Sequence, residues 1–167
     1  MKKIISLLIM MLSLNSYAQE NSHLGHIPLK DLNQNQITLD KYQGKKIYIK
    51  AWASWCSICL AGLAEIEEIS QKANNDIEII TIVSPGHKGE KTTNQFIEWY
   101  KGIESDYPNI TVLLDEQGDF IKQTEIRGYP HNLLLDSSLN LKKSIPGHLN
   151  SEQILHSITN CRRSDLI

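Results

Sequence analysis

The sequence is poor in the features that would assign it to several large functional classes. Its 17 basic and 19 acidic residues nearly balance, giving a formal net charge of −2, so no basic field favours nucleic-acid binding. Cysteines are few, and the six histidines include no HxxxH pair that would indicate a metal-ligating helix. The sequence contains no low-complexity segment or internal repeat. Its 167 residues favour one domain that can bury a core without several disulfides.

Long hydrophobic runs are also missing. The longest, residues 4–14, is about eleven residues long, and a membrane-spanning helix needs about twenty. Lys2 and Lys3 precede this run, and Ser16-Tyr17-Ala18 places small residues where a signal peptidase cuts. Residues 1–18 are therefore predicted to be a signal peptide, and residues 19–167 the exported, periplasmic domain. A signal that stays uncleaved as a membrane anchor is the alternative.

Strand and helix patterns alternate after the signal segment, beginning with polar residues 19–36, which we expect to be an exposed lead-in. Apolar alternation and continuous apolar runs predict strands at residues 37–39, 45–52, 77–83, 110–114, 132–135 and 139–145. Apolar residues at helical spacing predict helices from the CxxC to residue 73 and at residues 93–101, 117–123 and 151–159, the last capped by Ser151. This order predicts an α/β fold with a central mixed sheet and helices on both faces.

Cys56 and Cys59 are the strongest candidates for chemistry. Cys56 lies between a predicted strand and a helix, at the helix start, where free N–H groups and the helix dipole stabilise a thiolate. Cys59 follows one turn later, where it can attack a mixed disulfide formed by Cys56. The spacing alone leaves a structural disulfide and half of a zinc site open as alternatives. Cys161 is left over and is expected to be a bystander, with intermolecular pairing as the alternative.

Two segments together resemble the thioredoxin superfamily. Residues 51–59 (AWASWCSIC) resemble its active-site motif, and residues 126–130 (IRGYP) resemble the loop that carries its cis-proline. The predicted signal peptide, an extra N-terminal strand and an inserted strand–helix unit at residues 77–101 resemble the exported TlpA/ResA-like branch. Further segments are similar to the N-terminal reductase domain of periplasmic methionine sulfoxide reductase fusions of the PilB type: residues 50–56, 83–87, 90–91 and 99–100.

The resemblance implies a thioredoxin-like fold and a set of roles. Cys56 would be the nucleophile and Cys59 the resolving thiol of a redox-active disulfide, and Trp55 an exposed aromatic beside it. Pro130 would form a cis peptide bond with Tyr129 and present the backbone of Tyr129 to a substrate strand. The expected protein is a monomer that needs no cofactor or metal.

Three positions depart from the family pattern. Lys50 stands where thioredoxin has a buried aspartate; we expect either an ammonium that favours thiolates, or a side chain that reaches solvent or pairs with a carboxylate. Gly62 stands where many TlpA-like proteins have an acid, and Glu65, one turn later, is expected to be solvated. His131 replaces a threonine and is either an ordinary polar residue at a strand start or a charge that tunes Cys56.

The sequence therefore predicts a periplasmic thiol–disulfide oxidoreductase. The spacer Ser57-Ile58 lacks the histidine of strong oxidases, which favours a reductase. The resemblance implies electrons from a membrane thiol carrier of the DsbD/CcdA type and a client disulfide such as oxidised methionine sulfoxide reductase. An oxidase or isomerase is one alternative. A copper-binding thioredoxin-fold chaperone is another, although all three methionines lie within the predicted signal peptide.

Overall fold

The computed structural model describes residues 23–160; the predicted signal peptide and Cys161 lie outside that range. Seven strands form one sheet in the order β2-β1-β5-β4-β3-β6-β7, in which β4 is parallel to β3 and β5 and the other pairs are antiparallel. The strands are β1 (Leu29–Lys30), β2 (Gln36–Ile37), β3 (Lys46–Ala51), β4 (Ile77–Val83), β5 (Thr111–Leu114), β6 (His131–Leu135) and β7 (Leu141–Pro146). The helices are η1 (Leu39–Tyr42), α2 (Ser57–Ala61), α3 (Leu63–Lys72), α4 (Thr93–Tyr100), η2 (Glu104–Asp106), α5 (Asp119–Gln123) and α6 (Ser151–Asn160).

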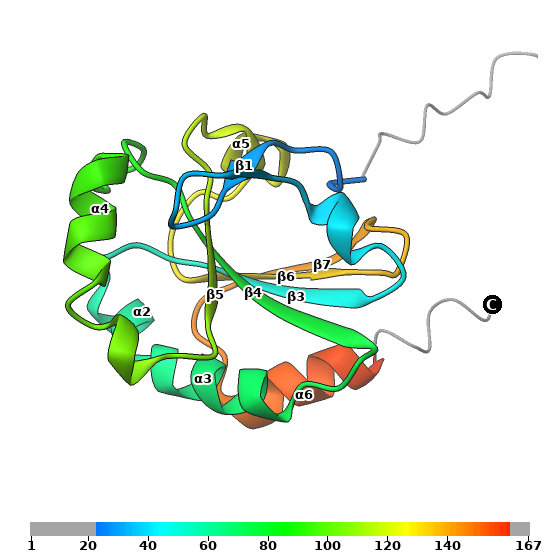
Figure 1. Cartoon of the computed structure of the whole chain (residues 1–167). Helices are drawn as coiled ribbons and strands as arrows, with labels where there is room; N and C mark the ends of the chain where they lie inside the picture. The colour runs from blue at the N-terminus through cyan, green and yellow to red at the C-terminus, as the bar shows by residue number, and fades with distance from the viewer. Residues whose placement is uncertain (1–22, 161–167) are drawn as a thin grey trace, which may run out of the picture.

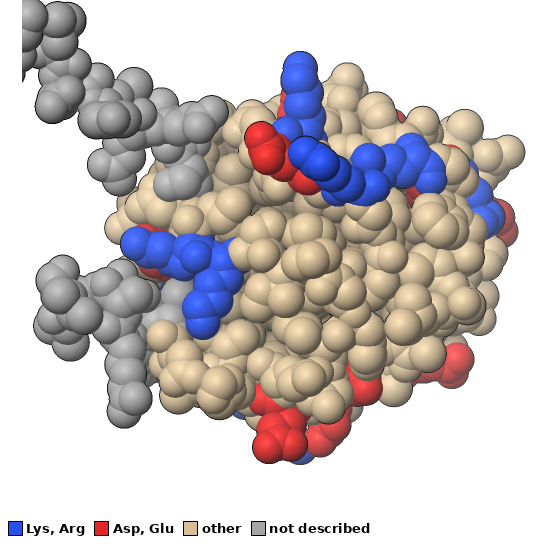
Figure 2. Space-filling view, turned by 180° about the vertical axis from the view of Figure 1, so that it is seen from behind, with Lys and Arg blue, Asp and Glu red and all other residues tan. Residues whose placement is uncertain are grey.

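The helices cover both faces of the sheet, which confirms the predicted fold class. In Figure 1, α2, α3 and α6 lie below the sheet, and α5 lies above it. Figure 2 shows many basic side chains, with some acidic ones among them, at the end where Figure 1 places α5, a second basic group at the left edge, and acidic side chains along the opposite end.

Strand β3 lies in the interior of the sheet, hydrogen-bonded to β4 on one side and β6 on the other. Its side chains alternate between the two faces. Ile47 and Ile49 pack into the core on the α5 side, whereas Tyr48 packs with Ile66 of α3 and Ile154 of α6. Lys50 therefore points toward the layer that contains α2 and α3.

The expected exposed lead-in is wrong for its middle part, whereas residues 33–36 are exposed as expected. Leu24, Ile27 and Leu29 are buried in the core on the α5 face, and β1 pairs with β5 at Leu114. The physical reason is that β5 would otherwise be an edge strand, and the N-terminal segment covers it. The strand expected at residues 37–39 is also shifted, since β2 ends at Ile37 and Leu39 begins η1.

Three helix boundaries differ from the prediction, and the smallest difference is that α5 begins at Asp119 and not at residue 117. The helix after the CxxC is interrupted at Gly62 and ends at Lys72, which leaves Ala73 exposed. The cap of α6 is Asn150 and not Ser151: Asn150 Oδ1 accepts the N–H of Gln153 at 2.9 Å, and Gln153 Oε1 accepts the N–H of Asn150 at 3.0 Å. None of the helices within residues 23–160 has the length and hydropathy needed to cross a membrane.

Candidate active site

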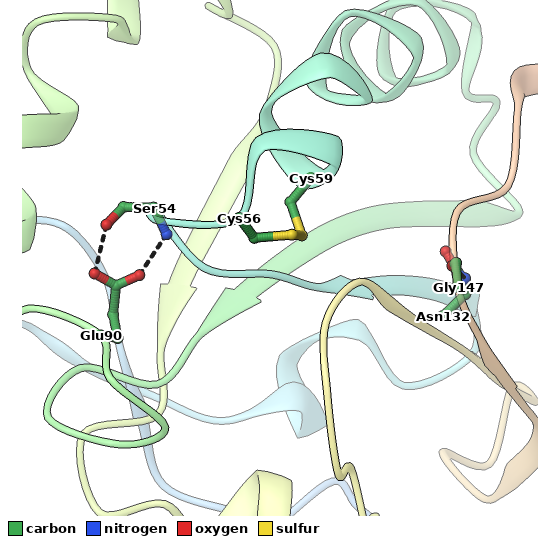
Figure 3. The surroundings of a disulfide bond; sticks show 6 residues. All are labelled: Ser54, Cys56, Cys59, Glu90, Asn132 and Gly147. Atoms are coloured by element: carbon green, nitrogen blue, oxygen red, sulfur yellow. Dashed lines mark hydrogen bonds between the residues drawn. A yellow bond between two sulfur atoms is a disulfide. The ribbon is translucent and has the colours of Figure 1, made fainter.

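Cys56 and Cys59 form a disulfide at the start of α2, with their Cα atoms 5.2 Å apart (Figure 3). Cys56 is the N-cap residue of the helix, and its carbonyl accepts the N–H of Cys59 at 3.0 Å. The residues differ in accessibility: Cys56 is 5% exposed and Cys59 is 0% exposed. A partner can therefore approach Cys56, while Cys59 stays covered by the fold.

Among residues 23–160, no group of three or more His, Cys, Asp or Glu side chains is arranged to hold a metal ion.

The segment that leads from β3 into Cys56 is anchored by a buried carboxylate, Glu90. Its oxygens accept hydrogen bonds from the hydroxyl of Ser54 at 2.6 Å and from the N–H of Ser54 (Figure 3). They also accept one from the N–H of Lys91 at 2.7 Å. The ammonium of Lys91 donates in turn to Ser54 Oγ at 2.6 Å. Glu90 and Lys91 contributed to the family resemblance, but no role was predicted for either. In sequence, adjacent acidic and basic residues in a loop are typical of a solvent-exposed surface. No sequence pattern indicates that the side chain of Glu90 is buried.

Trp55 and the loop before β6 border the disulfide, as the resemblance implied. Trp55 is 54% exposed, and its ring meets that of Tyr129 edge-on, with centroids 6.2 Å apart. The Tyr129–Pro130 peptide bond is cis. Burial raises the pKa of Tyr129, so its hydroxyl stays neutral at physiological pH. The aromatic pair is thus an exposed apolar border next to the less covered sulfur.

Lys50 is completely buried, so the expectation that its side chain reaches solvent is wrong. Its ammonium nitrogen has no hydrogen-bond partner among the residues that the structure describes, and it forms no close ion pair there. Burial lowers the pKa of Lys50, and the negative charge of Glu65 opposes that change. The alternative in which a fixed ammonium favours thiolates is weakened for the same reason, because burial favours the neutral amine.

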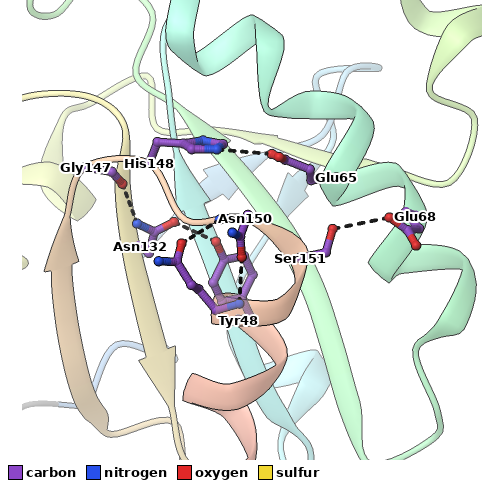
Figure 4. A network of polar contacts seen from close by, with 9 residues as sticks. Tyr48, Glu65, Glu68, Asn132, Gly147, His148, Asn150 and Ser151 are labelled. Carbon is purple, nitrogen blue, oxygen red and sulfur yellow. Dashed lines mark hydrogen bonds and ion pairs between the residues drawn. The ribbon is translucent and has the colours of Figure 1, made fainter.

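Glu65 is not the solvated helix residue that was expected. One of its carboxylate oxygens lies 3.5 Å from Nε2 of His148, a residue for which no role was predicted (Figure 4). The helix position expected to be solvated faces inward because α3 packs against the loop after β7. Because that loop is distant in sequence, the spacing of apolar residues within residues 57–72 could not predict that Glu65 contacts it.

His131 lies at the start of β6, nearly buried, with Nε2 2.8 Å from the hydroxyl of Ser144 on β7. Burial lowers the pKa of His131 below its ordinary value of 6.5, so the imidazole is neutral at neutral pH. A neutral ring cannot supply the charge required for tuning Cys56. The structure therefore favours the interpretation of His131 as a polar residue within the hairpin.

Known proteins share this arrangement. The Redoxin family model matches residues 15–158. An uncharacterized protein of Haemophilus influenzae is 60% identical over 154 residues, which is 92% of this chain and 96% of that protein. Among solved structures, the exposed lipoprotein thioredoxin Etrx1 of Streptococcus pneumoniae is 41% identical, with a TM-score of 0.75 over 80% of this chain and 97% of its own. The N-terminal domain of PilB from Neisseria gonorrhoeae is 30% identical, with a TM-score of 0.73 over 81% and 89%.

The family match extends over most of the chain and includes both the CxxC segment and the loop at Pro130. The solved relatives superimpose on the same sheet and helices, in agreement with the TlpA/ResA-like resemblance. The chain belongs to the Redoxin family and is a thioredoxin-like thiol–disulfide oxidoreductase whose cysteine pair is Cys56 and Cys59.

Proposed function

We propose that this protein is an exported disulfide reductase. It takes electrons from a membrane thiol carrier of the DsbD/CcdA type and passes them to client disulfides such as that of oxidised methionine sulfoxide reductase. The observation that carries the proposal is the pairing of a partly accessible Cys56 with a covered Cys59, beside an exposed Trp55. Likeness to the PilB N-terminal domain supports this direction of electron flow, and likeness to an exposed lipoprotein thioredoxin supports export.

The cysteines divide the reaction between them. The thiolate of Cys56 attacks one sulfur of the client disulfide, forms a mixed disulfide and releases the first client thiolate. Cys59 then loses its proton and attacks the sulfur of Cys56, which releases the second client thiolate and leaves the Cys56–Cys59 disulfide. Two electrons have passed to the client. The membrane carrier restores both thiols by the reverse sequence.

The reduction potential of the Cys56–Cys59 pair tests the direction of flow. We expect a value at or moderately above that of thioredoxin, about −270 mV, when the mature protein is equilibrated in graded thiol buffers. The quenching of tryptophan fluorescence by the disulfide provides the readout, because Trp55 adjoins Cys56. The reduced protein should also recycle an oxidised methionine sulfoxide reductase. A potential near about −120 mV would instead identify an oxidase and overturn the proposal.

A basic groove beside Trp55 is the surface that we assign to client docking. The groove has a volume of about 550 Å³ and is open to solvent; its lining includes His87, Lys88, Lys122 and Arg127, with Glu125 as the one acid. The ammonium of Lys88 donates to the carbonyl of Arg127 at 3.4 Å, which brings the loop before α4 against the loop that carries Tyr129. Because the whole chain is weakly acidic, this local excess of cations favours clients with acidic residues near their disulfide.

Reversing the charge of this groove should change substrate preference. Two synthetic disulfide-bonded peptides, one with glutamates and one with glutamines beside the cysteines, serve as probes. In the Lys88→Glu/Arg127→Glu protein we expect kcat/KM for the acidic peptide to fall about 10-fold, mainly through KM, with little change for the neutral peptide. Lys72→Glu, on the far side of the molecule, is the matched control. Equal losses for both peptides would contradict docking by charge.

A further inference from the structure

His87 lies in the loop between β4 and α4 and fastens that loop to the turn before α5. Its Nε2 lies 3.1 Å from the carbonyl oxygen of Glu116. Because a carbonyl oxygen can only accept, Nε2 carries the hydrogen and donates it. Gly118 makes room for the imidazole, since a Cβ atom at residue 118 would come within 2.7 Å of Cε1 of the ring. The ring therefore packs directly on the backbone of Gly118, and a larger residue there would displace it.

The residue that accepts this hydrogen bond is itself held in place. The carboxylate of Glu116 pairs with the ammonium of Lys30 on β1 at 2.5 Å. It also accepts the hydroxyl of Thr93, the first residue of α4, at 2.6 Å. Because Glu116 is tied to a strand and to a helix, its carbonyl offers the loop a fixed point of attachment through His87.

His87 is joined by its backbone to the carboxylate that anchors the active-site segment. The carbonyl of His87 accepts the N–H of Glu90 at 2.9 Å, so the two residues share one tight turn. The side chain of Glu90 reaches from this turn to Ser54, two residues before Cys56 (Figure 3). The N–H of Cys56 in turn donates to the carbonyl of Ala53 at 3.1 Å. An unbroken series of contacts therefore leads from His87 to the segment that carries Cys56.

The position of Cys56 decides how much of its thiol is ionised. Cys56 is the N-cap residue of α2, where free N–H groups and the helix dipole favour a negative sulfur. This stabilisation falls off within the first turn, so it depends on where the sulfur is held. A looser segment before Cys56 would lower the fraction of thiolate at neutral pH, and with it the rate of attack on a client disulfide.

We propose that His87 is a positioning residue of the active site. Its hydrogen bond to Glu116 holds the loop so that Glu90 keeps Cys56 at the start of α2. The inference rests on the proposed role of Cys56 as the attacking thiol. His87 acts through Glu90 and Ser54 rather than by contact with the sulfur. Removal of His87 and removal of Glu90 should therefore impair the same step by the same route.

Alkylation of the reduced mature protein by iodoacetamide measures the reactivity of Cys56, because Cys59 is covered by the fold. In His87→Leu, which fills the space of the ring but cannot donate, we expect the rate at neutral pH to fall about 10-fold and the midpoint of its pH profile to rise by about one pH unit. His87→Gln should stay within about 3-fold of the wild type, because its side-chain amide can donate to the same carbonyl. His156→Leu, at an exposed histidine of α6, is the control and should change neither the rate nor the profile.

A double variant separates positioning from a general loss of stability, which chemical denaturation of each protein reports independently. Because His87 acts through Glu90, His87→Leu/Glu90→Ala should be alkylated as fast as Glu90→Ala alone, within about 2-fold. The inference is overturned by a normal rate and pH profile in His87→Leu, by equal slowing in His87→Gln, or by single losses that multiply in the double variant. His87→Ala takes the place of His87→Leu if the leucine protein does not fold. A wild-type protein alkylated first at Cys59 would instead refute the proposed role of Cys56.

Discussion

Cys56→Ser should abolish turnover of client disulfides, by at least about 10³-fold in kcat/KM. Serine cannot form a mixed disulfide, and Cys59 is covered by the fold and cannot replace Cys56 as the attacking group. Cys59→Ser should also stop turnover but for another reason. Cys56 still attacks, and no second thiol resolves the product. Clients should therefore accumulate as mixed disulfides that migrate as a single species on non-reducing gels and separate on reduction.

The two variants are expected to differ in one respect: Cys59→Ser accumulates mixed disulfides with clients, and Cys56→Ser does not. If Cys59→Ser failed to trap clients while Cys56→Ser trapped them, the roles of the two cysteines would be reversed. Full turnover of client disulfides by Cys56→Ser would contradict any catalytic role for Cys56. The matched control is Ser57→Ala, which leaves both thiols in place and alters only the spacer between them. It should retain most of the activity.

Glu90→Ala should cause the largest loss of stability among single changes near the site, about 3 kcal/mol in the free energy of unfolding. The carboxylate accepts from two backbone N–H groups and one hydroxyl, and its removal leaves these donors unsatisfied in a buried loop. Chemical denaturation of the oxidised protein measures the difference. The loop that leads into Cys56 loses its anchor, so the rate of attack by Cys56 should fall as well.

Two companion variants make this result specific. Glu90→Gln keeps one acceptor oxygen but turns an amide group toward donors, so its loss should be intermediate. Glu98→Ala removes an exposed carboxylate of α4 that pairs with Lys101, the C-cap of the same helix, and it should change stability by less than about 0.5 kcal/mol. A Glu90→Ala protein as stable as Glu98→Ala would show that the anchor contributes little.

Local patterns predicted most elements because their cause is local. The continuous apolar run at residues 77–83 became β4 with the same bounds, and the alternating residues before Trp52 became β3. Two other predictions failed in part, for long-range reasons. The segment of residues 24–30 resembles a polar lead-in in sequence, yet its Leu24, Ile27 and Leu29 are buried because this segment covers the edge of β5. Helical spacing continued past Gly62 to Ala73, but the structure interrupts the helix at Gly62, where Lys50 and His148 pack against it.

The cysteine pair, the family and the class of reaction could be predicted from the sequence, because a CxxC at a strand–helix junction and a distant Tyr-Pro segment are short local patterns. The surroundings of that pair depend on tertiary packing and became visible in the structure. Glu90 turns inward to hold Ser54, and Lys50, Glu65 and His148 converge from a strand, a helix and a loop. The burial of a charged side chain depends on what packs over it, and those neighbours lie up to 98 residues away in the chain, as from Lys50 to His148.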